Sequence, residues 1–365
     1  MRYLDDLKKI IEINSYTKNK VGVDAVGFQM EEWLEDIGFK TKRYQRDEIG
    51  DHLLFKSPKI KTLPKILLLG HNDTVFPQGT FEGFKEDKDW IYGPGVCDMK
   101  GGNIVALEAL RDISKKGKIQ NIDFLLVSDE ETGSDNSKFI TLEIAKNYDY
   151  CFVFEAAGEN LEVVTSRKGV GTYTITIQGK AAHAGTSYNN GINANLEASY
   201  KLQELTKLTN LEIGTTVNVG KIIGGIGANT ISPKCELLLE IRYTKNSERD
   251  RLLNALNTIS NTSYIKGTNS TLSGLIQRDV MEENPIQLNF VKKLENITKS
   301  IILTEQRGGV SDANHVASCN VITLDGFGPF GDGDHTINER ALKSTFTQRI
   351  DMMSKILTAL TTIQK

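Results

Sequence analysis

The chain has 365 residues, which is more than a single hydrophobic core usually serves, so two domains are expected. Its apolar content of 39% and charged content of 25% exclude a disordered or collagen-like chain. The net charge of -3 provides no basic field for a phosphate backbone, so no nucleic acid partner is expected. Residues 1–15 lack the apolar run of a signal peptide, and no stretch approaches the roughly 18 apolar residues of a membrane span. A cytoplasmic protein without a membrane partner is predicted.

The amino-terminal part alternates helical and strand patterns. Apolar residues recur at three- and four-residue steps between Val23 and Ile37, and Gly38 follows as a carboxyl-terminal cap, which predicts a helix. A second helical pattern covers residues 103–116. Three short apolar runs predict strands covered by helices on both faces: 66–69, 122–127 and 151–154.

Metal-capable side chains follow these predicted strands. His71 comes after the first strand, Glu130 and Glu131 come after the second, and Glu155 ends the third. In an open α/β sheet, ligands gather beyond the carboxyl ends of the strands. The three strands therefore deliver these side chains to one edge of the sheet.

Around residue 168 the pattern becomes that of a self-contained α+β block. It contains strand patterns and helical patterns in the order 170–177, 192–208, 215–223, 235–243 and 247–259. If His335 belongs to the same site as His71, the chain must return to the first domain. We therefore predict an α/β catalytic domain of residues 1–168 and 278–365, with an inserted domain of residues 169–277.

Each candidate ligand has a simpler interpretation. His71 with Asp73 is either a metal ligand with an orienting carboxylate or a surface turn. Asp98 lies in a tight glycine-rich segment, where it is either a rigidly held ligand or a helix cap. The carboxylate of Glu155 ends an apolar strand and needs a cation, which is either a metal or a structural Arg or Lys. His335 lies in a loop rich in Gly and Asp, where a lone histidine is usually just exposed.

Glu130 and Glu131 are adjacent carboxylates, and this like-charge arrangement is unfavourable unless a positive charge relieves it. A metal does so, with one glutamate as ligand and its neighbour as general base. The alternative is a solvated acidic loop.

The remaining sulfur and imidazole groups favour structural roles. The four cysteines are far apart and lack zinc or disulfide spacing, so we expect them to be reduced and mostly buried: Cys97, Cys151, Cys235 and Cys319. A thiolate ligand role for Cys97 is the lesser alternative, because its side chain should point away from that of Asp98. His52 and His315 are interpreted as structural.

Eight motifs occur in order along nearly the whole chain: HxDTV (71–75), GPGxxDMKGG (93–102), DEExGS (129–134), Glu155, GKAAHAG (179–185), NxISP (229–233), GGxSDA (308–313) and His335. Together they resemble the zinc-dependent aminoacylase and glutamate carboxypeptidase family of metallopeptidases. The resemblance implies a mixed-sheet zinc-exopeptidase-like catalytic domain with an inserted lid and dimerisation domain.

The resemblance also assigns roles. One zinc would be held by His71, Asp98 and Glu155, and the other by Asp98, Glu131 and His335, with cobalt or manganese as possible substitutes. Such a pair can hold a bridging hydroxide and polarise the scissile carbonyl. By the same resemblance Glu130 is the general base and Asp73 orients His71.

The inserted domain is expected to complete the site in a homodimer. His183 resembles a histidine that reaches the active site from the partner subunit and stabilises the oxyanion. The residues that resemble substrate-binding positions are Asn229, Arg278, Gly308 and Gly309.

The expected function is hydrolysis of an amide next to a free carboxylate, in small peptides or N-acyl amino acids, closest to the glutamate carboxypeptidases. A succinyl-diaminopimelate desuccinylase or an acetylornithine deacetylase is the alternative enzyme. A non-catalytic binding protein on the same fold is the alternative of another class, and it should lack a ligand or the base.

Overall fold

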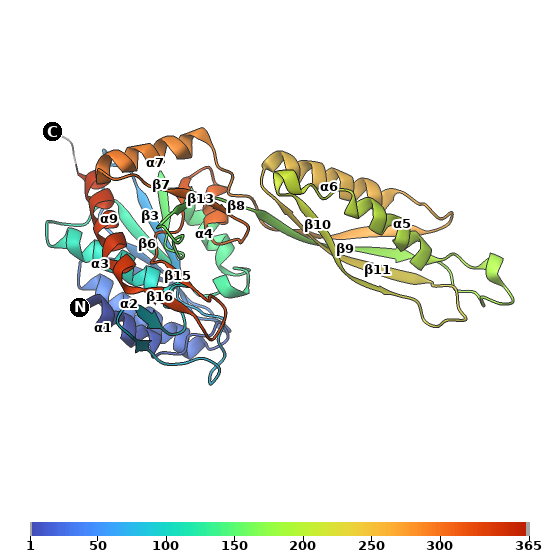
Figure 1. Cartoon of the computed structure of the whole chain (residues 1–365), viewed down its shortest axis with the longest axis horizontal. Coiled ribbons are helices and arrows are strands. Elements are labelled where there is room, and N and C mark those ends of the chain that lie inside the picture. Colours follow the sequence, from blue (N-terminus) through green and yellow to red (C-terminus); the bar gives the residue numbers. More distant parts are fainter. Residues whose placement is uncertain (1, 363–365) are drawn as a thin grey trace. The chain divides into compact units, whose positions relative to one another are not determined.

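The computed structural model describes residues 2–362 and divides the chain into two compact units. The first unit comprises Met1–Ser166, Glu283–Arg307 and Ser311–Lys365, and the second comprises Arg167–Glu282 and Gly308–Val310. The second unit thus interrupts the first in sequence (Figure 1).

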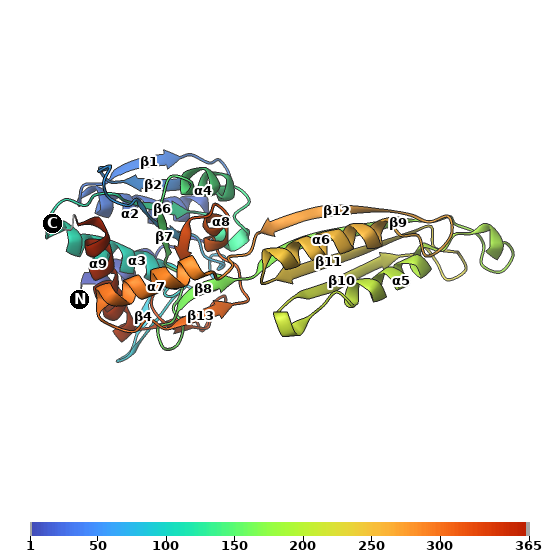
Figure 2. The same ribbon diagram turned by 90° about the horizontal axis from the view of Figure 1, so that it is seen from above.

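The first unit is built on a six-stranded mixed sheet (Figure 2). Across the sheet the strands lie in the order β1 (Lys40–Tyr44), β2 (His52–Lys56), β6 (Ile122–Val127), β3 (Ile66–His71), β7 (Tyr150–Val153) and β14 (Ile322–Leu324). The four strands from β6 to β14 are parallel, whereas β1 and β2 are antiparallel to their neighbours. This arrangement confirms the predicted α/β class with a mixed sheet.

Seven α-helices of the described residues belong to this unit: α1 (Arg2–Ile11), α2 (Lys20–Glu35), α3 (Lys100–Ser114), α4 (Ser137–Ala145), α7 (Pro285–Thr298), α8 (Ala313–Ala317) and α9 (Lys343–Thr361). All residues of β3 and β6 are buried, as expected for strands covered on both faces. Helix α3 packs against β3, α1 and α9. After α2 the chain turns at Gly38 with φ of +96°, which confirms the predicted glycine cap.

The strand register brings the candidate ligands together. His71 is opposite Val127 of β6, and Leu69 is opposite Val153 of β7. The segments that follow β3, β6 and β7 therefore leave the same edge of the sheet, as predicted. The segment after β6 forms a short 3₁₀ helix, η1 (Glu130–Thr132).

A small sheet supports the loop of His335. Its strands lie in the order β15 (Gly331–Asp332), β16 (Arg340–Leu342), β5 (Trp90–Tyr92) and β4 (Lys85–Glu86), and all of its pairs are antiparallel. Strands β15 and β16 form a hairpin, and His335 lies in its connection. A two-stranded sheet pairs β8 (Val163–Arg167) with β13 (Thr304–Arg307).

The second unit is an α+β block. Its antiparallel sheet has the order β10 (Thr216–Gly224), β11 (Lys234–Tyr243), β9 (Gly169–Gln178) and β12 (Asn269–Arg278). Helices α5 (Ala194–Thr206) and α6 (Asn246–Asn261) pack on this sheet around a separate apolar core. The segments η2 (Tyr188–Asn190) and η3 (Leu211–Ile213) are 3₁₀ helices. Strand β12 was not among the predicted elements, since it is mostly exposed and carries Gly274 with φ of +132°.

The boundaries of the units differ from the predicted domain boundaries at three places. The first unit ends at Ser166 and not at residue 168, it resumes at Glu283 and not at residue 278, and the GG segment belongs to the second unit. Gly308 and Gly309 were assigned to the catalytic domain, whereas they belong to the second unit. There, the Arg242 guanidinium donates to the Gly308 carbonyl over 3.1 Å, and Arg167 donates to that of Gly309 over 3.1 Å. These bonds are long-range in sequence, so the local pattern did not contain them.

The four cysteines are free thiols, three of them buried and Cys319 partly exposed, as predicted. His52 and His315 are buried in the first unit. The His52 ring contacts the Ser128 hydroxyl at 2.9 Å and the Asn136 amide oxygen at 3.2 Å. Within residues 2–362, no helix is long and apolar enough to cross a membrane.

Candidate metal centre

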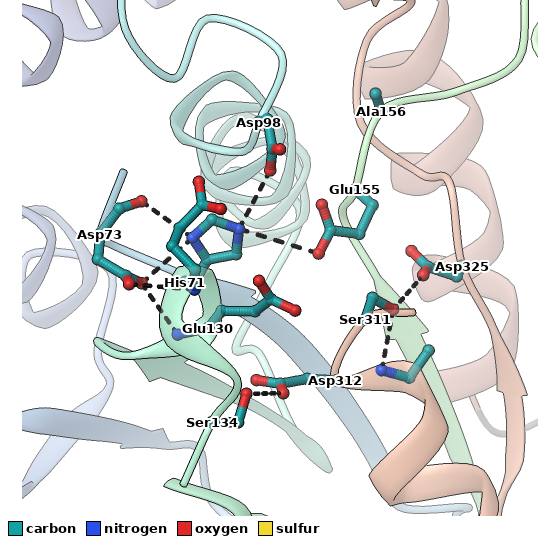
Figure 3. Close-up of polar contacts among 12 residues, drawn as sticks. His71, Asp73, Asp98, Glu130, Ser134, Glu155, Ala156, Ser311, Asp312 and Asp325 are labelled. Carbon is teal, nitrogen blue, oxygen red and sulfur yellow. Dashed lines mark hydrogen bonds and ion pairs between the residues drawn. The ribbon is translucent and has the colours of Figure 1, made fainter. Parts of the chain in front are cut away.

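The first ligand group combines residues at the ends of β3 and β7 with Asp98 from the segment before α3. The His71 Nε2 atom is 3.2 Å from Oδ1 of Asp98 and 3.9 Å from Oε1 of Glu155 (Figure 3). His71 and Glu155 are buried. These three side chains can offer one imidazole nitrogen and two carboxylate oxygens to a single cation. The charged groups that affect Glu155 most are Asp98 and His71, and neither is the structural Arg or Lys of the rival interpretation.

The His71 ring is held in one orientation. Its Nδ1 atom lies 3.0 Å from the main-chain oxygen of Asp73 and 3.4 Å from the Asp73 carboxylate. The carbonyl is the closer hydrogen-bond acceptor, so Asp73 orients the ring partly through its main chain. The Asn103 amide donates to the His71 carbonyl over 2.7 Å. With Nδ1 donating to Asp73, Nε2 is the nitrogen that faces the site. When protonated it donates to Asp98, and it can bind a cation once that proton is lost.

The second ligand group shares Asp98 with the first. Nε2 of His335 lies 3.1 Å from Oδ2 of Asp98 and 3.1 Å from Oε2 of Glu131. Asp98 therefore presents one carboxylate oxygen to each histidine. The capping interpretation of Asp98 is wrong, because Met99 is the residue that precedes α3 and the Asp98 carboxylate faces the histidines.

The electrostatics of the centre reflect crowded carboxylates. Burial and the charge of Asp98 raise the pKa of Glu131 to about 8, and the same two causes raise that of Glu155 well above its usual value. Burial also disfavours the charge of Asp98, yet hydrogen bonds from His335 and His71 keep its pKa below the usual range. Hydrogen bonds to Asp98 and Glu131 raise the pKa of His335 to about 11. In the absence of a metal, protons bound to the carboxylates and histidines of the two ligand groups therefore offset the negative charge of these carboxylates.

The donor set fits two divalent cations. Each group offers ligand atoms that lie within 4.8 Å of one another, and both groups combine imidazole nitrogen with carboxylate oxygen. Such ligands suit zinc, and they also suit cobalt and manganese. Cys97 belongs to neither group, because its thiol lies 2.8 Å from Asp334. This contact agrees with the structural interpretation of Cys97.

Glu130 lies beside the ligand groups without belonging to either of them. Its negative charge contributes to the raised pKa of Glu155, and Figure 3 shows its carboxylate near that of Glu155. The Asp73 carboxylate accepts the backbone N–H groups of Glu130 and Glu131, each over 3.3 Å. Asp73 thus fixes η1 as well as His71.

Several supporting residues escaped the sequence interpretation. The Thr17 hydroxyl donates to the Asp73 carboxylate over 2.7 Å, and the Ser134 hydroxyl donates to Asp312. The buried Glu339 carboxylate accepts backbone N–H groups of the segment that carries Asp98. Glu339 lies close after His335 in the sequence, and this was the only sequence signal for its contact with the Asp98 segment. The sequence around Thr17 contains no signal for its contact with Asp73.

The other predicted residues lie in the second unit. His183 and Asn229 are adjacent there, because their segments form an isolated bridge and the N–H of Ala184 donates to the Asn229 carbonyl over 2.8 Å. Both side chains are exposed. Arg278 ends β12 and is 3% exposed, which is unlike a free arm at a surface. The roles of these residues and of the GG segment toward substrate stay predictions.

Comparison with known proteins agrees with this geometry. The sequence model of peptidase family M20/M25/M40 matches residues 67–359. Carboxypeptidase G2 of Pseudomonas sp. (strain RS-16) is 32% identical over 259 residues, covering 68% of this chain and 62% of that enzyme. An acetylornithine deacetylase of Aliivibrio salmonicida is 28% identical over 243 residues, covering 62% of this chain and 63% of that enzyme. The matched stretch thus spans less than two thirds of these relatives.

Solved structures share the fold of the whole chain. Aminopeptidase PepT of Bacillus cereus superposes with a TM-score of 0.82 at 20% identity, covering 99% of this chain and 98% of that one. The YXEP protein of Bacillus subtilis, described as a dinuclear metal-binding peptidase, superposes with a TM-score of 0.73 at 14% identity over 99% and 98% of the two chains. At these identities the likeness concerns the fold alone. The family match, by contrast, covers most of the sequence and all five candidate ligands, and the chain belongs to the metallopeptidase family M20/M25/M40.

Proposed function

We propose that the protein is a metal-dependent hydrolase that cleaves an amide bond next to a free carboxylate. The observation that carries this proposal is the pair of ligand groups sharing Asp98, with the Glu130 carboxylate beside them. A non-catalytic relative would be expected to lack a ligand or the base, and this chain has both. Its similarity to carboxypeptidase G2 favours substrates with a carboxyl-terminal carboxylate, as small peptides and N-acyl amino acids have.

Two ions, zinc by preference, would be held by the two ligand groups. Bound there, they supply Lewis acidity that polarises the scissile carbonyl and makes a nearby water more acidic. The protein's own contribution is a rigid set of ligands whose orientation is fixed by Asp73 and Asn103.

Glu130 is the proposed proton carrier. As general base it takes a proton from the attacking water, and as general acid it returns that proton to the leaving amine nitrogen. Its neighbour Glu131 is committed to His335, so the two adjacent glutamates have different tasks. The Asp73 carboxylate accepts the backbone N–H groups of both glutamates and so holds the backbone from which their two side chains extend.

We further propose that residues of the second unit act on the substrate in a homodimer, in the cytoplasm. Nδ1 of His183 accepts the N–H groups of Gly185 and Thr186, each over 3.2 Å, which leaves the proton of the neutral ring on Nε2. An exposed Nε2–H is suited to donate to an oxyanion. Asn229 next to it, with Arg278, Gly308 and Gly309, would bind the substrate carboxylate and backbone.

The decisive test compares three glutamine variants. Glu130→Gln should lower kcat by about 10²- to 10⁴-fold while the purified protein still holds two ions per chain. Glu131→Gln should lose one ion, and Glu143→Gln on the exposed face of α4 should resemble wild type. Metal content is measured on each variant alongside turnover. Loss of metal in Glu130→Gln would show that the two roles are exchanged.

A substrate screen distinguishes the candidate activities. Release of free amino acid from N-acyl amino acids and dipeptides is followed, with acetylornithine and succinyl-diaminopimelate included. Acetylornithine deacetylation is the second candidate, because several relatives with that activity match the chain at 26–30% identity. Wild-type protein that binds two ions yet hydrolyses no amide would contradict the enzyme proposal.

Mixing two inactive variants tests the dimer. His183→Ala and Glu130→Gln each leave one intact half of the proposed site. A one-to-one mixture should regain about one quarter of wild-type activity, since half of the dimers are mixed and each holds one complete site. Verified mixed dimers without activity would rule out a shared site.

A further inference from the structure

The carboxylate of Glu339 binds the segment that carries the shared ligand Asp98. Its Oε2 atom accepts the N–H of Gly95 over 2.9 Å, and its Oε1 atom accepts those of Cys97 over 3.0 Å and Asp98 over 3.1 Å. Glu339 is 1% exposed. Three backbone donors to one buried carboxylate form charge-assisted bonds with fixed geometry.

Glu339 also belongs to the hairpin that presents His335. The hairpin pairs Gly331 with Ala341 and Asp332 with Arg340, and His335 and Glu339 both lie in its connection. The N–H of Glu339 donates to the Thr336 carbonyl over 3.2 Å, which ties the residue to the turn just after His335. One residue therefore touches the Asp98 segment and the His335 loop.

The pairing of β5 with β16 brings Glu339 to the segment that carries Asp98. Arg340 of β16 is opposite Tyr92 of β5, so the residues that precede β16 meet the residues that follow β5. The glycine-rich segment after β5 also needs a partner for its backbone N–H groups, since Gly93 and Gly95 have φ of +154° and +84° and lie outside regular secondary structure. The Glu339 carboxylate supplies that partner.

We propose that Glu339 is a positioning residue that sets the distance between Asp98 and His335, and thereby the affinity of the second metal ion. This inference rests on the proposed metal-dependent function. Asp98 contributes to both ligand groups, but only the second group also depends on the hairpin. The first group retains His71 at the end of β3 and Glu155 just after β7 when the contact is lost, so the two ions should respond unequally.

The test measures metal binding directly. Metal-free protein is titrated with Co²⁺ and with Zn²⁺, followed by visible absorption for cobalt and by calorimetry for both. Glu339→Gln keeps the volume of the side chain, but its amide NH₂ would face a backbone N–H donor and lose that bond. We expect the second ion to bind about tenfold more weakly and the first to stay within about threefold of wild type. Glu339→Ala should exceed this loss, and Glu339→Asp should recover part of the affinity.

Two reference variants define the outcome. His335→Ala shows the behaviour of a chain that holds the first ion alone. Asp332→Asn is the matched control, because that carboxylate lies on the same hairpin and contacts Arg340 at the surface. Equal weakening of both ions in Glu339→Gln, or two ions bound as tightly as in Asp332→Asn, would overturn the positioning role. Wild-type protein that binds fewer than two ions would overturn the proposed function as well, so the two failures are distinguishable.

Discussion

The two ligand groups share Asp98 but differ in how the fold supports them. The His71 side chain is 1% exposed and ends a central strand, whereas the His335 side chain is 59% exposed and lies in a hairpin loop. His335 also has a φ of 60°, in the left-handed region that few non-glycine residues adopt. The first group is therefore fixed by the sheet itself, and the second depends on loop contacts such as that of Glu339.

Replacing each histidine by alanine should show this difference most strongly. In metal-free protein, His71→Ala removes the buried partner of Asp98, which then keeps only the exposed His335, and should lower the free energy of unfolding by about 3 kcal/mol. His335→Ala removes an exposed pairing, and less than about 1 kcal/mol is expected. Urea unfolding of metal-free protein gives both values. Equal losses would mean that the sheet edge is no more rigid than the loop.

The next largest effect should come from protons that occupy the ligand residues in metal-free protein, and it should appear as a pH dependence of stability and of metal affinity. In metal-free protein the pKa of Glu131 is raised to about 8 and that of His335 to about 11, so the folded state binds more protons than the unfolded state at neutral pH. The stability from these groups is present at low pH and falls as the pH rises through these values. Asp98, with its lowered pKa, has the opposite dependence but acts only in acid.

Metal ions replace these protons, so metal affinity should rise between pH 5.5 and pH 8. The increase is up to about tenfold per pH unit for each proton released. Calorimetry in buffers of different ionisation enthalpy counts the protons. Glu131→Gln, which should lose the second ion, should release fewer protons in total on metal binding, and the first ion should keep its own pH dependence. A metal affinity that is constant over this pH range would contradict the inference that the ligand residues hold protons in metal-free protein.

The same difference explains what the sequence could predict. His71, Glu130, Glu131 and Glu155 follow apolar strand patterns, and parallel strands necessarily bring such ends to one edge. Asp98 and His335 follow no strand of the six-stranded sheet. The residues made them candidate ligands with simpler alternatives, and the family resemblance assigned them to the site. A local pattern could not do so, because a loop's path depends on contacts that such a pattern does not contain.

Supporting residues were harder still to predict. Glu339 is 241 residues from Asp98 in the sequence, and Thr17 is 56 residues from Asp73. A lone Glu or Thr gives no periodic signal, so only the folded chain reveals these contacts. Arg278 is the opposite case, since the family resemblance predicted that it binds the substrate, and its side chain is buried at the end of β12. Its task toward substrate stays a prediction.

Thr17→Val should have the smallest effect on the metal centre, and it tests Asp73, the residue that serves both groups. Asp73 orients His71 chiefly through its main-chain carbonyl, whereas its carboxylate holds η1 and accepts the Thr17 hydroxyl. Loss of that buried bond should cost about 1 kcal/mol in unfolding free energy. We expect kcat to fall by less than about tenfold, because Glu130 shifts while His71 stays in place.

The control is Thr206→Val, which removes an exposed hydroxyl in the second unit. First-ion affinity should be unchanged in both variants, and a drop in Thr17→Val would show that the Asp73 carboxylate, rather than its carbonyl, fixes the His71 ring.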